Sequence, residues 1–489
     1  MFNHNGRCSF TRIAAPVAPF IVWPRSARYN EKNNELYRYK TGGEDMEKYM
    51  CLLTRIEEMM QSTAYQEGDR LPSIRQLSAR YQVSKSTVIR ALQELEKRHL
   101  IYSVPKSGYY IVKKTGKSKS AQPGRIDFAT SAPDPDVFPY LDFQHCINKA
   151  IDTYKNDLFI YGTPKGLPSL IRVLRKLLAN QQVFADERHI FITSGVQQAL
   201  SLLCAMPFPN GKEKIAIEQP GYHLMVEQLE TLGIPAIGVK RTEEGLNLTE
   251  VERLFQTESI KFFYTMPRFH NPLGCSLSER DKQELVRLAE AYDVYLVEDD
   301  YLGDLEENKK ADPLHAYDLS SHVIYLKSFS KMMFPGLRVG AAVLPEALTD
   351  KFHAYKKLND IDCSMISQAA LEIYLKSGMY GRHKEKIRDS YKERSLRLHQ
   401  AIQTHRQLGS GRFTFSGGQA PCMHTHLVLP VDLPASRVIH RLKKQGVHLE
   451  AIDRHYLSGY QKENLLKINI SNVKTEDIDR GVKLLMSHL

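Results

Sequence analysis

The stretch SFSKMMFPGLR, residues 328–338, contains the lysine whose role decides the fold assignment. One lysine, Lys331, stands among small hydroxyl residues, and a proline, a glycine and then Arg338 follow close behind it. A lysine in such surroundings is either a solvated surface residue or a nucleophile. Which of the two it is depends on the chemistry that the rest of the chain brings to it.

The composition is that of a large protein with more than one domain. The chain has 489 residues, of which 42% are hydrophobic and 25% charged, so two or three domains with a sizeable core are expected. Its seven cysteines are scattered and form no CxxC pair, which is typical of a reducing cytosol rather than a disulfide framework. No apolar run approaches the roughly 18 residues that a membrane span needs. We therefore expect a cytoplasmic protein with no membrane partner.

The first 45 residues differ from the rest of the chain. RIAAPVAPFIVW loosely imitates the apolar region of a signal peptide, but two prolines break it. Codons for the later stretch TGGED can spell a purine-rich ribosome-binding sequence just before Met46. We therefore expect Met46 to be the natural start, and residues 1–45 to be a non-native or disordered extension.

A basic segment with orderly periodicity begins at Met46. Residues 46–120 carry 14 Lys and Arg against 7 Asp and Glu, an excess that indicates a polyanionic partner. YMCLLTRIEEMM has the apolar spacing of a helix, Ser73 with Gln76 forms a capping-box signature, and Ser84 precedes the amphipathic stretch KSTVIRALQELEKR. LIYSVPKSGYYIV then predicts a hairpin with a basic tip. Together these elements predict a winged helix-turn-helix.

This segment resembles the GntR-family winged-helix regulators in LPSIR (residues 71–75), Val83–Ser84 and Thr87–Val88. By that resemblance residues 46–113 form the DNA-binding domain and contact a double-stranded operator. A basic residue taken alone is more often merely solvated. Together, however, these residues occupy the positions at which a winged helix-turn-helix contacts DNA. The residues expected to face DNA are Arg75, Lys85, Ser86, Thr87 and Arg90, with Lys106 and Gly108 in the wing.

Residues 114–125 are basic, contain Ser and Gly, and lack periodicity, so we expect a flexible linker there. Beyond it, the runs KIAIE, IKFFYTM, VYLVEDD and VIYL are almost continuously apolar, as strands buried on both faces of a parallel sheet are. Helical patterns such as SERDKQELVRLAEAY separate them. We therefore expect residues 126–489 to be a large α/β domain with a parallel or mixed sheet, whose site lies at the carboxyl ends of the strands.

Polar residues follow several of these predicted strands. Asp299 and Tyr301 follow VYLVE, Asn271 follows FFYTMPRFH, and Tyr222 follows KIAIEQPG. TSGVQQAL is a strand-to-helix turn whose free N–H groups suit a phosphate. Each feature alone has a simpler explanation as a cap, a core residue or a turn. The ordered series, which ends with the Lys331 motif behind VIYL, is what indicates a site.

That series resembles fold-type I pyridoxal-phosphate (PLP) enzymes of the aminotransferase class over residues 126–489. Such a cofactor needs a lysine imine, an anion at the pyridine nitrogen, a phosphate cradle and a stacking ring. The resemblance implies that Lys331 forms the Schiff base, that Asp299 pairs with the pyridinium and that Tyr222 stacks on the ring. It assigns the ring's phenolic oxygen to Tyr301 and Asn271. It assigns the phosphate to Ser328, Ser330, Arg338, the N–H groups of Val196 and Gln197, and Tyr161 from the other subunit of a dimer.

A GntR-type reading head joined to an aminotransferase-like domain is the layout of the MocR-type regulators. The resemblance implies a transcriptional regulator whose large domain senses PLP, or its aldimine with a small amino compound, in a head-to-tail, domain-swapped homodimer. A second hypothesis is an active PLP-dependent aminotransferase whose DNA-binding domain controls its own gene. A third is a relic that dimerises without cofactor, which the residues around Lys331 disfavour. Sustained turnover of amino donors and keto acids would favour the second over the first.

The chain departs from the aminotransferase pattern at one position. The arginine that clamps the substrate carboxylate in a strand of the form RxxxS is replaced in LLKINIS by Lys467. An ammonium is a single charge rather than a planar fork. We therefore expect Lys467 to contact the effector, and we expect efficient transamination to be disfavoured.

The stretch CMHTH, residues 422–426, has the alternation that metal ligands on a strand can use. Cys422, His424 and His426 would lie on one strand face, but no fourth ligand is near in the sequence. We therefore expect no bound metal.

Overall fold

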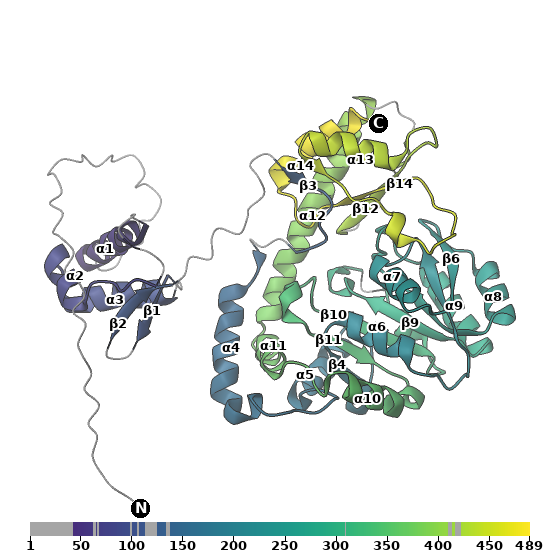
Figure 1. Cartoon of the computed structure of the whole chain (residues 1–489), viewed down its shortest axis with the longest axis horizontal. Helices are drawn as coiled ribbons and strands as arrows, with labels where there is room; N and C mark the ends of the chain where they lie inside the picture. The colour runs from purple at the N-terminus through teal and green to yellow at the C-terminus, as the bar shows by residue number, and fades with distance from the viewer. Residues whose placement is uncertain are drawn as a thin grey trace, which may run out of the picture. The chain divides into compact units, whose positions relative to one another are not determined.

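The computed structural model describes residues 43–61, 65, 68–97, 100–104, 107–112, 125–133, 137–308, 310–408, 413–415 and 422–489 (Figure 1). Backbone contacts divide the chain into two compact units, Met1–Ser120 and Ala121–Leu489. The predicted N-terminal extension up to residue 42 and the predicted linker up to residue 124 lie outside the described residues.

Three helices and a hairpin form the described part of the first unit (Figure 1). The helices are α1 (Gly43–Gln61), α2 (Ile74–Tyr81) and α3 (Lys85–Lys97), and the antiparallel hairpin joins β1 (Ile101–Val104) to β2 (Gly108–Ile111). The apolar stripes predicted from spacing form the core, since Ile56, Leu92 and Leu95 are fully buried. Ser73 and Gln76 make the predicted capping box, which fixes the start of α2. The predicted winged helix-turn-helix is confirmed.

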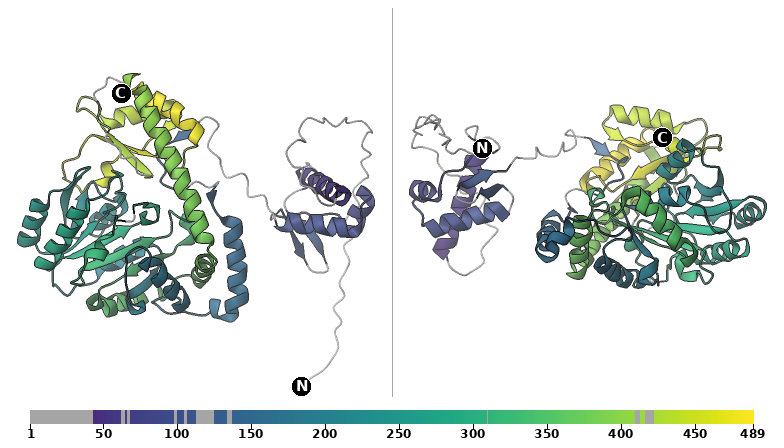
Figure 2. Two further views of the ribbon diagram at one scale, coloured as in Figure 1. Left: turned by 180° about the vertical axis from the view of Figure 1, so that it is seen from behind. Right: turned by 60° about the horizontal axis from the view of Figure 1, so that its bottom comes forward.

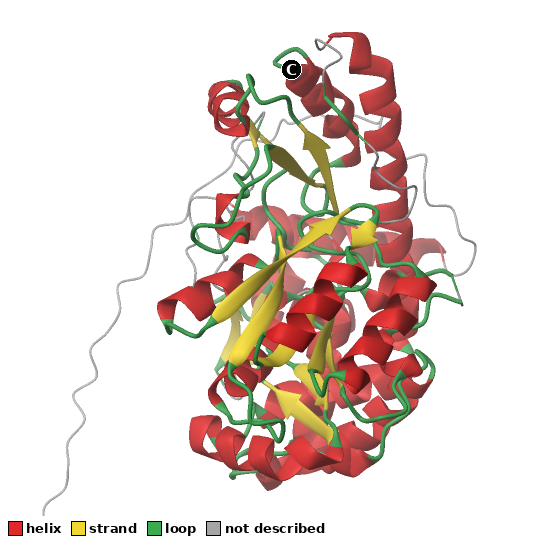
Figure 3. Ribbon diagram, turned by 90° about the vertical axis from the view of Figure 1, so that its right-hand side faces the viewer, coloured by secondary structure: helices red, strands yellow, loops and turns green. Residues whose placement is uncertain are grey.

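An eight-stranded mixed sheet organises the described part of the second unit (Figure 3). Its strand order is β4-β11-β10-β9-β8-β5-β6-β7. The run from β10 to β6 is parallel, whereas β11 is antiparallel to both of its neighbours and β7 is antiparallel to β6. The strands are β4 (Ile190–Thr193), β5 (Lys214–Gln219), β6 (Ala236–Thr242), β7 (Gly245–Leu246), β8 (Ile260–Thr265), β9 (Tyr295–Asp300), β10 (Val323–Ser328) and β11 (Gly340–Val343). The predicted α/β class with a mixed sheet is confirmed.

Helices cover both faces of this sheet, which is why its central strands read as continuous apolar runs (Figure 3). Along β8, Phe262 and Tyr264 pack into one core, and Phe263 between them packs into the other. The first core includes residues of α4 (Tyr140–Tyr154), α5 (Pro168–Ala179), α6 (Val196–Ala205), α7 (His223–Thr231), α10 (Glu346–Asp360) and α11 (Met365–Lys376). The second core includes residues of α8 (Leu248–Thr257) and α9 (Glu279–Ala291).

A smaller C-terminal subdomain packs on one long helix, α12 (Met379–His405), as Figures 1 and 2 show. Its strands pair β12 (His424–Val428) antiparallel with β14 (Leu465–Asn469), and β13 (Val447–His448) parallel with β3 (Ile126–Asp127). Its other helices are α13 (Ala435–Lys444) and α14 (Thr475–Met486). The first half of α12 contributes Tyr380 and Ile387 to the first core of the sheet. The second half contributes Leu398 and Ile402 to a separate core inside the C-terminal subdomain. One helix therefore belongs to both cores.

The other helical segments in the described part of the chain are single 3-10 turns. They are Lys155–Leu158, Glu187–His189, Gly303–Leu305, Leu314–Tyr317, Pro335–Leu337, Arg406–Leu408 and Asp453–His455. Of all the helices in the described ranges, none is long and apolar enough to cross a membrane.

Candidate functional site

A cavity of about 600 Å³ lies where β5, β8, β9 and β10 end. The carboxyl ends of parallel strands meet at one edge of a sheet, and the polar residues that follow them line this cavity together. The lining contains every residue predicted for the cofactor or effector except Tyr161: Val196, Gln197, Tyr222, Asn271, Asp299, Tyr301, Ser328, Ser330, Lys331, Arg338 and Lys467. The structure thus brings residues that are far apart in the sequence to one cavity.

The carboxylate of Asp299, near the end of β9, is buried with one oxygen unsatisfied. Its Oδ2 accepts a hydrogen bond of 2.8 Å from the hydroxyl of Tyr264, whereas Oδ1 has no hydrogen-bond partner among the residues that the structure describes. Burial raises the pKa of Asp299 to about 7, against the lowering effect of the Tyr264 bond. A buried carboxylate oxygen without a donor is costly. The protonated ring nitrogen of PLP is a donor of the kind that this oxygen lacks, so Asp299 fits that cofactor.

Lys331 follows β10 and places its amine in the same cavity. Its Nζ donates to the main-chain oxygen of Ser131, and the Ser131 hydroxyl oxygen lies 3.3 Å away. Burial lowers the pKa of Lys331 to about 8. A lowered pKa increases the neutral fraction of this amine near physiological pH, and the neutral amine is the form that attacks a carbonyl group.

The pKa of Lys331 gives a direct prediction for the protein without cofactor. Because burial lowers this pKa from 10.5 to about 8, the neutral amine should be half formed at pH 8. Its rate of reductive methylation should therefore rise with pH and level off above about pH 9. Peptide mapping by mass spectrometry would follow Lys331 beside the exposed Lys444 in the same samples. A Lys331 rate still climbing steeply between pH 9 and 10 would contradict the lowered pKa.

An anion cradle forms between α6 and the Lys331 motif. Gly195 precedes α6, and no side chain in the described ranges caps this helix. Its first residues, Val196 and Gln197, line the cavity, so their N–H groups are available at its wall. Arg338 has a left-handed backbone with φ 52°, and its Nη2 donates to the main-chain oxygen of Ser194 at 2.7 Å. A Cβ atom on Gly195, whose φ is 83°, would lie 2.9 Å from the same Nη2. Glycine thus permits the guanidinium to approach the helix N-terminus, and the combination suits a phosphate.

The opposite wall joins the sheet to the C-terminal subdomain. Lys467 on β14 is buried, and its Nζ donates to Oδ1 of Asn271 at 3.0 Å. Burial lowers the pKa of Lys467 to about 8. The hydroxyl of Tyr301 donates to the main-chain oxygen of Phe269 at 2.7 Å. Asn271 is thus already bonded to the residue predicted to contact the effector, a link that the sequence did not suggest.

Two tyrosine rings, Tyr222 and Tyr301, line the ring-binding side of the cavity. Tyr222 precedes α7 and lines the cavity, and burial, followed by the charge of Asp299, raises its pKa. The ring of Tyr301 stacks on that of His424 with centroids 6.3 Å apart and an interplanar angle of 28°. Both tyrosine rings are held by packing, which suits them to a flat ligand.

Three lining or supporting residues were missed from the sequence. Tyr264 lies inside the apolar strand IKFFYTM and reads there as an ordinary core residue. Ser131 and His223 also line the cavity. Ser131 follows no strand of the predicted sheet, and His223 comes directly after Tyr222 behind β5 but was not singled out. Tyr264 carried one signal, because a buried tyrosine hydroxyl near the carboxyl end of a strand needs a polar partner.

Tyr161 and Lys106 are placed differently from the other predicted residues. Tyr161 is 80% exposed and does not line the cavity of its own chain. Its contact with a second subunit stays a prediction. Lys106, at the tip of the predicted wing, lies outside the described residues.

The histidines of the CMHTH stretch are engaged by neighbouring residues. Nδ1 of His424 lies 3.0 Å from Nδ2 of Asn469. His426 lies 3.0 Å from the main-chain oxygen of Leu273 through Nδ1, and 3.1 Å from Oε1 of Glu243 through Nε2. In the described ranges, no group of three or more His, Cys, Asp and Glu residues is arranged to hold a metal ion.

A second candidate surface lies on the helix-turn-helix. Arg75 on α2, with Lys85, Ser86 and Arg90 on α3, is exposed, and Thr87 is half-buried. The hydroxyl of Ser84 accepts a hydrogen bond of 3.1 Å from the Thr87 N–H, which fixes the start of α3. Gly108 starts the second hairpin strand with φ 130°. The exposed hydroxyl and basic side chains at the start of α3 suit a helix that contacts DNA.

Two different protein families match the two units of the chain. Residues 126–485 match the family described as aminotransferase class I and II, and residues 49–111 match the bacterial regulatory proteins of the gntR family. The fold and the cavity thus define a fold-type I aminotransferase domain joined to a GntR helix-turn-helix. The chain belongs to the MocR type of GntR-family transcriptional regulators, which combine these two domains.

Two curated relatives are also helix-turn-helix regulators. The HTH-type transcriptional regulator YcxD of Bacillus subtilis (strain 168) is 95% identical over 444 residues, which cover 91% of this chain and 100% of that protein. The HTH-type transcriptional regulator YdcR of Escherichia coli (strain K12) is 29% identical over 385 residues, which cover 73% of this chain and 82% of that protein.

Solved aminotransferases share the fold of the large domain. Pyrococcus horikoshii kynurenine aminotransferase, in complex with PMP, is 26% identical with a TM-score of 0.68 over 75% of this chain and 90% of its own. LysN, an α-aminoadipate aminotransferase from Thermus thermophilus complexed with N-(5'-phosphopyridoxyl)-L-leucine, is 24% identical with a TM-score of 0.66 over 75% and 92%. The second likeness shows the fold alone.

Proposed function

We propose that this MocR-type transcriptional regulator binds PLP at the cavity beside Lys331 and responds to PLP or to a small amino compound. One observation carries the proposal. A buried lysine with a lowered pKa, an anion cradle and a buried carboxylate, one of whose oxygens has no partner among the described residues, line one cavity. A lysine with only a structural role would not need a buried carboxylate and an anion cradle in the same cavity. The aminotransferase class I and II fold independently implies dependence on PLP.

The residues of this chain divide the binding between them. Lys331 Nζ would attach covalently to the cofactor, and Asp299 Oδ1 would accept a hydrogen bond from its ring nitrogen. Tyr222 would stack on the ring, while Tyr301 and Asn271 would hold the phenolic oxygen. Bound PLP supplies an aldehyde carbon that condenses with primary amines and a ring that withdraws electrons from it. The phosphate would contact Arg338, Ser328, Ser330 and the N–H groups of Val196 and Gln197.

The effector would enter on the side of Lys467. A single ammonium whose pKa lies near 8, already bonded to Asn271, recognises a carboxylate less strongly than an arginine fork does. This favours a sensor over the alternative, an active aminotransferase with an autoregulatory DNA-binding domain. The groups required for amine exchange at Lys331 are nevertheless present, so turnover is the property that separates the two functions.

A homodimer would complete the site. Phe159, Ile160 and Tyr161 are consecutive and 68%, 64% and 80% exposed, which is unusual for aromatic and branched apolar side chains in water. We propose that this segment packs on a second subunit, where Tyr161 would reach the phosphate. The dimer would be head-to-tail and domain-swapped, and the protein would act in the cytoplasm.

Binding to operator DNA in the presence of effectors tests the regulatory proposal. Fluorescence anisotropy would measure the affinity of the full-length protein for DNA from upstream of its own gene, with and without PLP and a panel of amines. We expect PLP or one PLP–amine pair to change this affinity at least about fivefold. Parallel assays with amino donors and keto acids should show no sustained turnover. Many turnovers, or a DNA affinity that neither PLP nor any amine changes, would contradict the proposal that the large domain is a sensor.

Substitutions on α3 test the DNA-reading surface. Lys85→Ala and Arg90→Ala should each weaken operator binding by roughly tenfold, because each would remove a cationic contact. A lost phosphate contact should also lower the slope of log affinity against log salt by about 1. Arg55→Ala, which removes an exposed cation from α1, serves as the matched control. Equal weakening by all three variants would indicate only a general loss of positive charge.

A further inference from the structure

The turn between α10 and α11 has a strained backbone. Ile361 has φ 55° and ψ −63°, and the N–H of Asp362 donates to the main-chain oxygen of Asp360. This is the γ-turn with a positive central φ, which is rare and strained, and a β-branched residue tolerates it poorly. The Ile361 side chain is 46% exposed, so burial of that side chain does not account for the strain. Such strain persists where surrounding contacts impose it.

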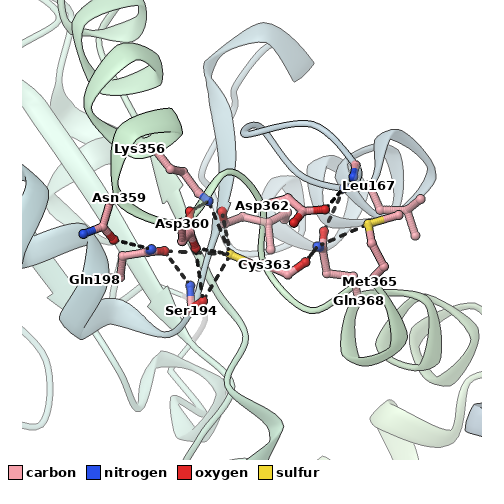
Figure 4. A network of polar contacts seen from close by, with 12 residues as sticks. Leu167, Ser194, Gln198, Lys356, Asn359, Asp360, Asp362, Cys363, Met365 and Gln368 are labelled. Atoms are coloured by element: carbon pink, nitrogen blue, oxygen red, sulfur yellow. Dashed lines mark hydrogen bonds and ion pairs between the residues drawn. The ribbon is translucent and has the colours of Figure 1, made fainter. Parts of the chain in front are cut away.

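The residue before the turn supports the anion cradle of its own subunit (Figure 4). Oδ1 of Asp360 accepts a hydrogen bond of 2.9 Å from Nζ of Lys356, which is fully buried. Oδ2 accepts a hydrogen bond of 3.4 Å from the hydroxyl of Ser194. The main-chain oxygen of Ser194 in turn accepts the bond from Arg338. Asp360 therefore contacts the residue on which the cradle is built.

The residue after the turn holds the segment that carries Tyr161. Oδ2 of Asp362 accepts a hydrogen bond of 2.6 Å from the N–H of Gly162. A Cβ atom on Gly162 would lie 2.7 Å from that oxygen and 2.9 Å from Sδ of Met365, so only glycine fits this close approach. Asp362 thus fixes the backbone immediately after Tyr161.

A second clamp fixes the far end of the same segment (Figure 4). The N–H of Leu167 donates to Oε1 of Gln368 at 2.7 Å, and Nε2 of Gln368 donates to the main-chain oxygen of Cys363 at 2.9 Å. Gln368 is fully buried. Residues 162 and 167 are therefore both anchored to the turn and the helix that follows it.

We propose that Asp362 is a positioning residue for the cofactor site of the partner subunit, because it holds Gly162 and thereby presents Tyr161. The two sides of one strained turn then serve two sites: Asp360 supports the cradle of its own subunit, and Asp362 supports that of the other. This inference rests on the proposed function, in which Tyr161 reaches the phosphate of the second subunit.

The homodimer gives the first test. Asp362→Ala removes the acceptor for the Gly162 N–H and should weaken PLP binding by roughly tenfold, measured by absorbance titration of the full-length protein. Asp362→Asn retains an acceptor oxygen at the same reach and should bind PLP nearly as the wild type does. Equal loss in both variants, or loss in neither, would overturn the positioning role.

Mixed dimers give the decisive test, since the effect must appear in the other subunit. Two chains with different tags would be co-expressed and purified through both tags. In the first dimer one chain carries both Lys331→Ala and Asp362→Ala and the other is wild type, so the intact Lys331 site receives Tyr161 from a chain without Asp362. In the second dimer one chain carries Lys331→Ala and the other Asp362→Ala, so the intact Lys331 site receives Tyr161 from a chain that keeps Asp362. The reference pairs Lys331→Ala with wild type.

The expected result is roughly tenfold weaker PLP binding in the first dimer, with the second matching the reference. The same loss in both mixed dimers, or no loss in either, would overturn the inference. A reference dimer that binds no PLP would instead refute the proposed cofactor site, and chains that do not purify together would refute the proposed dimer. If Asp362→Ala does not fold, Asp362→Glu displaces the acceptor by one methylene and should give the same pattern.

Discussion

Replacing Lys331 by alanine is expected to abolish the visible absorption band that the wild-type protein shows with PLP. The band requires a covalent bond between the cofactor and a lysine amine, and Lys331 is the cavity lysine that follows β10 beside the anion cradle. Near-ultraviolet and visible spectra of both purified proteins, recorded after incubation with PLP and gel filtration, would measure the loss. Adding amines one at a time to the wild type would then search for the effector.

Lys467→Ala is the matched control for this experiment. Lys467 lines the same cavity, and burial lowers its pKa to the same value of about 8, but it lies on β14 rather than behind β10. This variant should keep the band and lose the spectral response to amines that carry a carboxylate. A band that survives Lys331→Ala would place the covalent bond elsewhere. A wild type that stays colourless with PLP would make the large domain a dimerisation scaffold.

Replacing Asp299 by alanine should weaken PLP binding by roughly 10²–10⁴-fold. Breaking a buried ion pair by removing one partner costs about 3–5 kcal/mol, because the remaining charge is left buried without its counterion. Asp299→Asn preserves the volume and an oxygen for the Tyr264 hydroxyl while it removes the charge. It should also bind PLP weakly, which would show that the charge matters more than the shape. Affinity within a few-fold of the wild type in both variants would refute the pairing.

The same aspartate should destabilise the protein when no cofactor is bound. Burial raises the pKa of Asp299 from 3.8 to about 7, so the folded state disfavours the ionised form. Its free-energy cost is absent below about pH 4, grows as the pH rises toward 7, and is complete above that value. Without cofactor, Asp299→Asn should therefore be more stable than the wild type at pH 8, and the difference should vanish near pH 4. Denaturant unfolding at both pH values would measure it.

Residues with local sequence signals were the predictable part of this site. Lys331 and Asn271 follow apolar strands, and Asp299 lies at the end of one. Parallel strands bring their carboxyl ends together whatever their order in the sheet. The capping box at Ser73 and the apolar stripe of α3 likewise follow from spacing alone. Such features are encoded within a few residues of one another.

The contacts that join distant segments were not predictable. The bond between Asp362 and Gly162 spans 200 positions, and that between Lys467 and Asn271 spans 196. No local periodicity encodes which side chain of one loop meets the backbone of another. Tyr264 stayed hidden for a related reason, because its hydroxyl matters only once β9 lies beside β8 and brings Asp299 within reach.

Because α12 belongs to two cores, the chain cannot be divided at this helix without exposing apolar side chains. The helix has 27 residues and is about 40 Å long, and its two halves complete different hydrophobic interiors. A chain cut after His405 would leave Leu398 and Ile402 facing water and would take Lys467 away from the cavity. The C-terminal wall of the cavity can therefore change by single substitutions. Replacing it as a whole segment would expose the apolar side chains of α12, the helix that also contributes to the core beside Lys331.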